Sequence, residues 1–325
     1  MNPPQSQTSR RVLLVELTSV HGFVLYPQCL LLLEAGYEVT ILINAQNLER
    51  ELLSRLRDRV TWIELPDSRY VSLARAFFQA FRGDYDFILF NTFTPLSHGL
   101  FEFLQRRPIR FIVHNWKATR FNQGPLHPLL LRKADRIYVL SPQVYAHTQA
   151  HLPVRVGSKL SLLHLVYYPD HVHTEPYTFS SPDGRVHFAI LGQIKNWRNF
   201  AGLMANFERI SQSPLADQIA IHVLGRASNP LGQQFIGQAR AHGLLGSVIH
   251  VQAADYEPFD RFAEQLQQCH FILPLIDHTV LPVRKYGTMT ASSSLMLSRA
   301  FSVPLVASTD YTIDADLEPY ALRYA

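Results

Sequence analysis

The sequence predicts an α/β protein built from two doubly wound, Rossmann-like domains that face each other across a cleft. Short continuous apolar runs alternate with helical patterns along both halves of the chain, which is typical of parallel sheets covered on both faces. The alternation stops once, near the middle, in a stretch rich in turn residues. The 325 residues also exceed the usual length of a single domain.

The first half begins with Val12–Glu16, a continuous apolar run that predicts a strand buried on both faces. A loop leads into the helical segment QCLLLLEAGY, which ends at Gly36, and EVTILIN follows as the next strand. These segments form one β-α-β unit. The alternation then continues through VTWIEL (strand), RYVSLARAFFQAF (helix), DFILFN (strand), SHGLFEFLQ (short helix), IRFIVHN (strand), PLLLRKA (helix) and RIYVLS (strand).

An interdomain linker is predicted between about Ser158 and Arg185, where YYPDHVHTEPYTFSSPDGR concentrates proline, histidine and turn residues. We therefore expect an N-terminal domain over residues 1–165 and a C-terminal domain over residues 166–325. In the second half the expected segments are VHFAILG (strand), NFAGLMANFERIS (helix), IAIHVLG (strand), LGQQFIGQARAHGL (helix), SVIHVQ (strand), PFDRFAEQLQQC (helix), HFILPL (strand), SSSLMLSRAF (helix) and PLVAS (strand).

Composition excludes several classes of protein. The formal charge of +4 and pI of about 9.1 suit phosphate ligands or an acidic membrane surface, while the scattered basic residues disfavour a nucleic-acid binder. Two cysteines provide no disulfide framework and no metal spacing. The polar start, MNPPQSQTSRR, predicts a disordered lead and no signal peptide, and no apolar run is long enough to span a membrane. We expect a cytoplasmic protein, with peripheral contact at the inner face of a membrane as an option.

Ligands of doubly wound sheets bind beyond the carboxyl ends of the strands, which selects a small set of loops. In the first domain these loops carry His21, Gly22, Asn91, Thr92, His114 and Asn115. In the second domain they carry Gly192–Arg198, Gly225, Arg226, Asp277, His278 and Arg284–Ser294.

Three consecutive serines, Ser292–Ser294, begin the last predicted helix just after Arg284 and Lys285. One reading is that they only cap the helix. The other is that small residues at a helix N-terminus let a phosphate approach the backbone N–H groups. Lys195 and Arg198 leave the first strand of the same domain, so four cations and this helix start favour a diphosphate site.

Several segments resemble retaining glycosyltransferases of the GT-B type. FAILGQIKNWRNFAGLM resembles the opening of the second domain of that group, and HFILPL followed by SSSLMLSRAFSVPLVAS resembles its donor-sugar segment. IRFIVHN and LLRKADRIYVLS resemble strands of its first domain. The resemblance covers nearly the whole chain, and the order of the motifs carries most of its weight.

The resemblance implies transfer of a sugar from a nucleotide-diphosphate sugar to an acceptor, which is a glycan, a lipid or a small molecule. It implies no metal and no cofactor beyond the nucleotide sugar, and an acceptor-side first domain with a donor-binding second domain. His114 and His21 would be catalytic. Donor-binding residues would be Gly192, Lys195, Arg198, Arg226, Arg284, Lys285, Ser292, Ser293 and Ser294, and the acceptor side would include Gly22, Asn91 and His98.

The chain departs from the group in one respect that bears on activity. Many members carry two glutamates seven residues apart near this helix start, and the matching positions here are Thr290 and Leu297. The chain also ends at Ala325, which leaves little room for the usual C-terminal helix. These departures keep a catalytically degenerate scaffold or partner protein open, and the same cleft would also suit a sugar-nucleotide epimerase.

Other chemistry is disfavoured. The triplets Asp84–Asp86 and Asp314–Asp316 have the spacing of a metal-binding motif but stand where turn or cap residues are expected. His114 ends a buried strand and is either functional or a satisfied core histidine. The first loop contains only Gly22, without the glycine fingerprint of a dinucleotide site.

Overall fold

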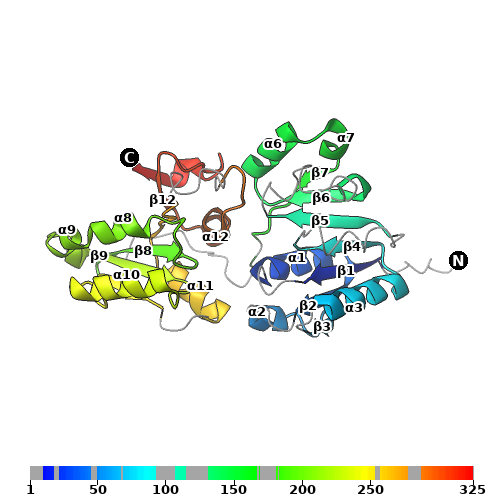
Figure 1. Cartoon of the computed structure of the whole chain (residues 1–325), viewed down its shortest axis with the longest axis horizontal. Helices are drawn as coiled ribbons and strands as arrows, with labels where there is room; N and C mark the ends of the chain where they lie inside the picture. Colours follow the sequence, from blue (N-terminus) through cyan, green and yellow to red (C-terminus); the bar gives the residue numbers. More distant parts are fainter. Residues whose placement is uncertain are drawn as a thin grey trace, which may run out of the picture. The chain divides into compact units, whose positions relative to one another are not determined.

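The computed structural model describes residues 10–17, 22–44, 50–66, 69–92, 107–114, 131–166, 168, 181, 183–252, 257–276 and 287–324, with the backbone alone at 22, 23, 50, 51, 69 and 70. The chain divides into two compact units, Met1–Tyr167 (unit 1) and Tyr168–Ala325 (unit 2) (Figure 1). The predicted helix SHGLFEFLQ lies outside the described residues, as do His21, His98, Asn115, Asp277, His278, Arg284 and Lys285.

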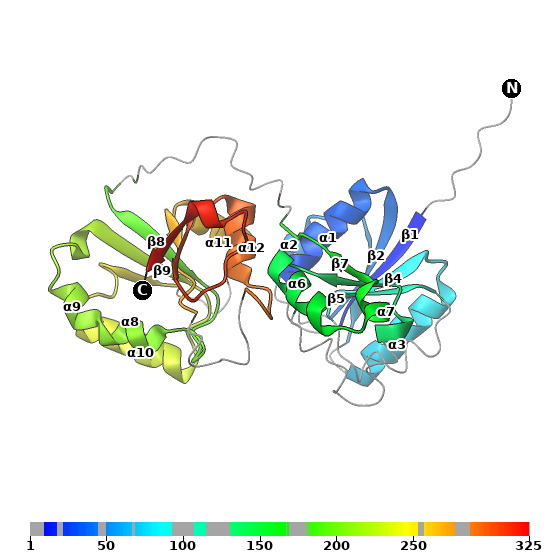
Figure 2. The ribbon, with the colours of Figure 1, turned by 90° about the horizontal axis from the view of Figure 1, so that it is seen from above.

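Among the described residues, unit 1 contains a seven-stranded parallel sheet in the order β3-β2-β1-β4-β5-β6-β7 (Figures 1 and 2). Its strands are β1 (Arg10–Glu16), β2 (Tyr37–Asn44), β3 (Thr61–Leu65), β4 (Phe87–Phe90), β5 (Ile109–Val113), β6 (Arg136–Val139) and β7 (Leu160–Leu162). Its helices include α1 (Gly22–Glu34), α2 (Arg50–Ser54), α3 (Arg69–Arg82), α6 (Pro142–His151) and α7 (Val154–Gly157). The apolar runs predicted as strands up to residue 141 are strands.

The start of the predicted linker is wrong, because β7 lies inside it. Leu160–Leu162 pairs in parallel with β6, and Leu160 is 5% exposed. Three residues are too short a run for an alternation to stand out, so only pairing with β6 identifies this strand. Helix α6 was not predicted, because its sequence PQVYAHTQAH has no apolar stripe. Ser141 caps this helix, since its Oγ accepts a hydrogen bond from the Val144 N–H at 3.3 Å.

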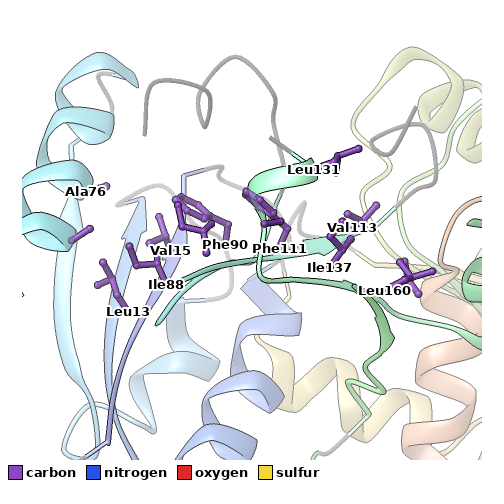
Figure 3. Packing of buried hydrophobic residues seen from close by; sticks show 14 of the residues in the cluster. Leu13, Val15, Ala76, Ile88, Phe90, Phe111, Val113, Leu131, Ile137 and Leu160 are labelled. Atoms are coloured by element: carbon purple, nitrogen blue, oxygen red, sulfur yellow. The ribbon is translucent and has the colours of Figure 1, made fainter. Parts of the chain in front are cut away.

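The core of unit 1 on one side of the sheet joins strand residues to α3 and to the helical turn at 131–133 (Figure 3). Phe90 and Phe111 stack at its centre, with ring centroids 5.7 Å apart. Ala76 of α3 and Leu131 lie on this side, and α1 lies on the other. The small Ala76 and Ala80 let α3 approach the sheet closely, with Leu73 and Phe77 packed against the same core.

The described part of unit 2 contains a six-stranded parallel sheet in the order β10-β9-β8-β11-β12-β13. Its strands are β8 (Val186–Leu191), β9 (Ile219–Leu224), β10 (Ile249–Val251), β11 (Phe271–Ile272), β12 (Leu305–Ser308) and β13 (Ala321–Tyr324). Its α-helices are α8 (Phe200–Ala205), α9 (Phe207–Ser211), α10 (Pro230–Ala241), α11 (Phe259–Gln267) and α12 (Ser293–Phe301). Phe200, Phe207 and Phe235 pack edge to face in its core.

Two details of unit 2 differ from the prediction. The helix predicted over NFAGLMANFERIS breaks at Asn206, whose Nδ2 donates to the Gly202 carbonyl at 2.8 Å. Such back-bonding by asparagine competes with the helix. The final strand, β13, was not predicted, because ALRY carries one exposed residue after another and becomes a strand by pairing with β12.

Both sheets change the direction of strand order once. In unit 1 the change lies between β1 and β4, and in unit 2 between β8 and β11. We call the position where the strand order reverses the switch point of the sheet. Doubly wound sheets bind ligands in the crevice at the carboxyl ends of the two strands that flank this point. The polar residues that follow β1, β4, β8 and β11 therefore lie where a ligand is expected.

A ladder of four histidines, His187, His222, His250 and His270, crosses the sheet of unit 2, which we call sheet 2. His187 Nδ1 lies 2.9 Å from His222 Nε2, and the His222 and His250 rings stack with centroids 5.0 Å apart. The His187 backbone N–H donates to His270 Nδ1 at 2.8 Å. Burial is the main cause that lowers the pKa of His222, to about 4, and it also lowers the pKa values of His250 and His270.

We expect unit 2 to lose stability as the pH falls from about 6.5 to about 4. Over this range the unfolded chain binds a proton at His222, whereas burial keeps the native His222 neutral until the pH nears its lowered pKa of about 4, so the free energy of unfolding decreases with falling pH. Melting temperatures across this range test the expectation. The His222→Gln variant should show a shallower decline than the wild type, and equal slopes would contradict it.

Candidate functional site

The switch point of unit 1 is occupied by a buried carboxylate. Glu16 is the last residue of β1 and has 0% exposure. Its Oε2 accepts two hydrogen bonds, from Asn91 Nδ2 at 2.5 Å and from Thr92 Oγ1 at 2.7 Å. Both donors follow β4 directly, so the two strands at the switch point are joined through one carboxylate oxygen. These bonds offset part of the cost of burying the carboxylate.

Asn91 is the centre of this network. It is 0% exposed, and its Oδ1 accepts a bond from Gln28 Nε2 of α1 at 2.5 Å. Its backbone N–H donates to the Val15 carbonyl at 3.0 Å. The sequence placed Asn91 on the acceptor side. The structure places Asn91 at the carboxyl end of β4, as predicted. Its side-chain amide is hydrogen-bonded to Glu16 and Gln28.

His114 follows β5 and joins the same network. Its Nε2 lies 2.8 Å from the Asn91 carbonyl oxygen, which makes this nitrogen the donor. Burial lowers the pKa of His114 to about 4, and the bond to Asn91 only partly opposes this effect. The imidazole is therefore neutral near pH 7. The His114 side chain is half-buried, so part of its surface is accessible at the carboxyl ends of the strands.

Sequence reasoning missed Glu16 and Gln28 as site residues. The available signal was an ionisable residue at the end of a continuous apolar run, VLLVE, and an amide directly before the apolar run CLLLL. A polar group in such surroundings must find partners on folding. Gly22 begins α1, and its backbone is all that is described there.

Replacing Asn91 with alanine should lower the free energy of unfolding by about 3 kcal/mol, because Glu16 stays buried and loses one of its donors. Denaturant titration measures the loss. The double variant Glu16→Gln/Asn91→Ala should lose less than the sum of the two single variants, because the buried charge is then absent. Additive losses would show that Asn91 and Glu16 do not interact.

In unit 2 the loops after β8 and β9 approach each other closely at two glycines. Gly192 has φ of 84°, which side chains rarely adopt. A Cβ at Gly225 would lie 2.3 Å from the Gly192 carbonyl carbon. The two glycines therefore let the backbones meet at the carboxyl edge of the sheet, beside the switch point.

Arg198 lies at this switch point. Its Nη1 donates to the Pro274 carbonyl, just after β11, at 2.9 Å. Its backbone pairs with Ile276, and a Cβ at Gly192 would lie 3.3 Å from Nη2. The guanidinium is thus held between the segments that follow β8 and β11. A cation fixed in this way is preorganised for an anionic ligand.

The other described cations of the predicted donor set lie on neighbouring loops. Lys195 Nζ lies 4.5 Å from the centroid of the Trp197 ring. Arg226 is exposed, its Nε donates to Ser228 Oγ at 3.1 Å, and its carbonyl accepts from the Ile194 N–H at 3.0 Å. The loops that follow β8 and β9 are therefore joined by this backbone bond, and both loops carry a basic residue.

The serines begin α12, but Ser292 does not cap it with its side chain. Ser292 is the N-cap residue and makes no side-chain cap bond, because its Oγ accepts from the Tyr311 hydroxyl at 2.5 Å. Ser294 is 1% exposed, and its Oγ has no hydrogen-bond partner among the described residues. Ser293 is half-buried. The simple capping reading therefore does not account for Ser292.

The acidic triplets have structural partners. Asp84 pairs with Arg107 at 2.7 Å, and Asp86 accepts from the Arg11 N–H at 2.7 Å. Arg299 of α12 binds both Asp314, at 3.0 Å, and Asp316, at 2.7 Å, which ties the helix to the C-terminal segment. Within the described residues, no group of three or more histidine, cysteine or acidic side chains gathers as a metal site.

The positions of the missing glutamates differ in their surroundings. Thr290 precedes α12, and its carbonyl accepts from the Gly287 N–H at 3.0 Å. Leu297 is 7% exposed in the middle of α12. A carboxylate at Leu297 would be desolvated unless a partner accompanied it.

No protein-family model and no curated protein sequence matches this chain. Solved structures do. Anabaena HepE in complex with UDP-glucose matches 97% of this chain and 85% of its own, with a TM-score of 0.63 and 11% identity. Sucrose-phosphate synthase from Thermosynechococcus elongatus matches 97% and 85%, with a TM-score of 0.62 and 15% identity.

The chain has a GT-B fold. A putative UDP-N-acetylglucosamine 2-epimerase from Listeria monocytogenes is also similar, with a TM-score of 0.59, 14% identity and coverage of 91% of this chain and 78% of its own. The predicted GT-B resemblance and the two α/β sheets are thus confirmed at the level of the fold. At such low identities, activity has to be argued from the residues of this chain.

Across the described part of this GT-B chain, no helix is both long and apolar enough to cross a membrane.

Proposed function

We propose that this protein is a glycosyltransferase that takes its sugar from a nucleotide-diphosphate sugar. The observation that carries the proposal is Arg198, a guanidinium held by the Pro274 carbonyl at the switch point of sheet 2. A diphosphate leaving group carries the charge that such a fixed cation stabilises.

The start of α12 provides the second part of the donor site. The Ser292 side chain is committed to Tyr311, so it does not occupy the first N–H groups of the helix. Those groups and the helix dipole favour an anion. Gly192, Lys195, Arg226, Arg284, Lys285, Ser293 and Ser294 complete the proposed donor-binding set. The nucleotide sugar is the sole co-substrate in this proposal, and no metal takes part.

Unit 1 (Met1–Tyr167) is proposed to hold the acceptor, and unit 2 (Tyr168–Ala325) is proposed to hold the donor. His114 would act at the transferred sugar as a neutral imidazole, with its orientation set by the Asn91 carbonyl. His21, Gly22, Asn91 and His98 are proposed for the acceptor side. The acceptor is a glycan, a lipid or a small molecule.

Binding of nucleoside diphosphates and nucleotide sugars tests the proposal first. A ligand that binds only the native state raises the melting temperature, so a panel of uridine, adenosine and guanosine diphosphates identifies the base. Release of the diphosphate from a bound nucleotide sugar then tests for transfer to an acceptor or to water. Absence of binding across the panel would reduce the assignment to the fold alone.

An epimerase is the second candidate, favoured by the likeness to the Listeria monocytogenes protein. The two reactions differ in their products without an acceptor. An epimerase converts the nucleotide sugar into its epimer, whereas a transferase leaves the sugar configuration of unreacted donor unchanged. Chromatography or proton NMR of the recovered nucleotide sugar distinguishes them.

A catalytically degenerate scaffold is favoured by Thr290 and Leu297, which stand where carboxylates are expected from the resemblance. Nucleotide binding without turnover of any donor would support this candidate.

A further inference from the structure

Helix α3 exposes an apolar stripe on its outer face. Val71 is 52% exposed, Phe78 56% and Phe81 67%, which places large apolar side chains in water at helical spacing. The inner face of the same helix is buried through Ser72, Ala76 and Ala80. The helix is therefore already anchored to the sheet, and its outer aromatic residues have no role in the core.

The exposed aromatic side chains are held in place by a half-buried neighbour. Phe77 packs against the core of unit 1. Its ring lies edge-on to Phe78, with centroids 6.1 Å apart, and stacks with Phe81, also at 6.1 Å. Because these phenylalanines are already packed against a neighbour, they lose little side-chain entropy on binding. An apolar surface of this kind is suited to insertion into a membrane interface.

The charges on α3 are all of one sign. The helix RYVSLARAFFQAFR contains three arginines and no acidic residue. Arg82 lies over the Phe78 ring, 5.7 Å from its centroid, and Arg75 donates to the Glu64 carbonyl at 3.3 Å. A basic helix with exposed aromatic residues is typical of contact with an anionic membrane surface.

A cationic cavity lies at the amino edge of the same sheet. Its volume is about 400 Å³, and Arg107, Lys133 and Lys159 line it together with Asp135. Asp135 is paired with Arg110 at 2.9 Å, and Lys159 donates to the Ala134 carbonyl at 2.7 Å. The basic residues of this lining outnumber its one acidic residue, so the cavity suits a phosphate group.

The cavity adjoins the C-terminal end of α3. Asp84, two residues after α3, pairs with Arg107 on the cavity wall at 2.7 Å. This pair is exposed, at 83% for Asp84 and 44% for Arg107, so it contributes little stability and can yield to a phosphate. Ala76 of α3 and Leu131, beside the cavity segment 133–135, pack on the same core cluster and lie on the same side of the sheet (Figure 3).

We propose that the outer face of α3 and the adjoining cationic cavity form a docking surface for an anionic lipid bilayer. Phe78 and Phe81 enter the interface, Arg75 and Arg82 lie at the headgroup level, and the cavity takes a lipid phosphate. Charge complementarity selects this occupant over a second copy of the chain, since a self-paired stripe would bring arginines of equal sign together. The proposal does not depend on the transfer reaction.

Flotation with lipid vesicles tests the docking surface. The protein should float with vesicles of phosphatidylcholine and phosphatidylglycerol, should not float with phosphatidylcholine alone, and should be released by high salt. Phe78→Ser/Phe81→Ser should weaken partitioning by about 10- to 100-fold. Arg75→Gln/Arg82→Gln should weaken it about 10-fold or more, since each charge contributes about fivefold.

Leu215→Ser provides the matched control, because Leu215 is equally exposed, at 56%, but lies in unit 2. This variant should float like the wild type. Circular dichroism and melting curves should show that all variants are folded, as the substituted side chains are exposed or partly exposed. Equal flotation with neutral and anionic vesicles, or unchanged flotation of the phenylalanine variant, overturns the proposal. A wild-type dimer that this variant converts to a monomer assigns the face to a second copy instead.

Discussion

Replacing His114 with alanine is expected to lower sugar-nucleotide turnover by about 100-fold or more, the scale of a positioned catalytic group. The affinity for the nucleoside diphosphate should stay nearly unchanged, because the proposed diphosphate site lies on unit 2 and His114 lies on unit 1. Turnover assays and calorimetry on the same preparation measure both quantities.

The matched control is His114→Gln. Its side-chain amide can still donate to the Asn91 carbonyl, which His114 Nε2 approaches to 2.8 Å, but it offers no imidazole for proton transfer. If His114 acts chemically, both variants lose turnover. If His114 only braces Asn91, glutamine restores the activity and the melting temperature together, and the catalytic assignment is wrong.

The pH profile gives a second readout for His114. Because burial lowers its pKa to about 4, the imidazole loses its neutral form only when the pH falls through about 4. Turnover that depends on the neutral form should therefore hold from neutral pH to about pH 5 and fall below it. A decline centred near the ordinary histidine value of about 6.5 would point to another group.

Replacing Arg198 with alanine is expected to weaken binding of the nucleoside diphosphate by about 10- to 150-fold. This range corresponds to the loss of one charge-assisted bond, about 1.5–3 kcal/mol. Arg198→Lys keeps the charge but loses the planar fork, so its affinity should lie between those of the alanine variant and the wild type. Isothermal titration calorimetry measures all three affinities.

Arg209 provides the control for a general effect of charge, because it is exposed on α9, outside the proposed site. Arg209→Ala should bind the diphosphate like the wild type. The Pro274 bond makes one further check necessary, since Arg198 also joins the segments that follow β8 and β11. A melting temperature near that of the wild type shows that the lost affinity arises from the ligand contact. Unchanged affinity in Arg198→Ala would remove this residue from the site.

The positions of two donor-side residues could be predicted from the sequence. Gly192 and Arg198 were expected at a strand end, and the structure places them beside the switch point of sheet 2. Their roles in binding stay predictions. The position was predictable because a glycine that ends an apolar run, followed by basic residues, is a local pattern.

The acceptor-side network was only partly predictable. Asn91 and His114 were expected at the carboxyl ends of the strands of unit 1. Glu16 and Gln28 were instead interpreted as parts of a buried strand and a buried helix. Their meaning depends on the bonds between Glu16 and Asn91 and between Gln28 and Asn91. Glu16 and Asn91 are 75 positions apart in the sequence, and Gln28 and Asn91 are 63 positions apart. No local sequence pattern predicts contacts between residues so far apart.

By itself, the sequence determined the two α/β halves and the main strands, because apolar periodicity is a local property, whereas the gathering of its cations and serines into one donor site stays a prediction. Tertiary structure alone decided that β7 and β13 are strands, that Ser292 bonds to Tyr311 instead of capping α12, and that Glu16 is held by Asn91 and Thr92. It also decided which phenylalanines of α3 are exposed. Each of these depends on a partner distant in the chain, and pairing with that partner, more than intrinsic propensity, stabilises the short strand and the buried polar group.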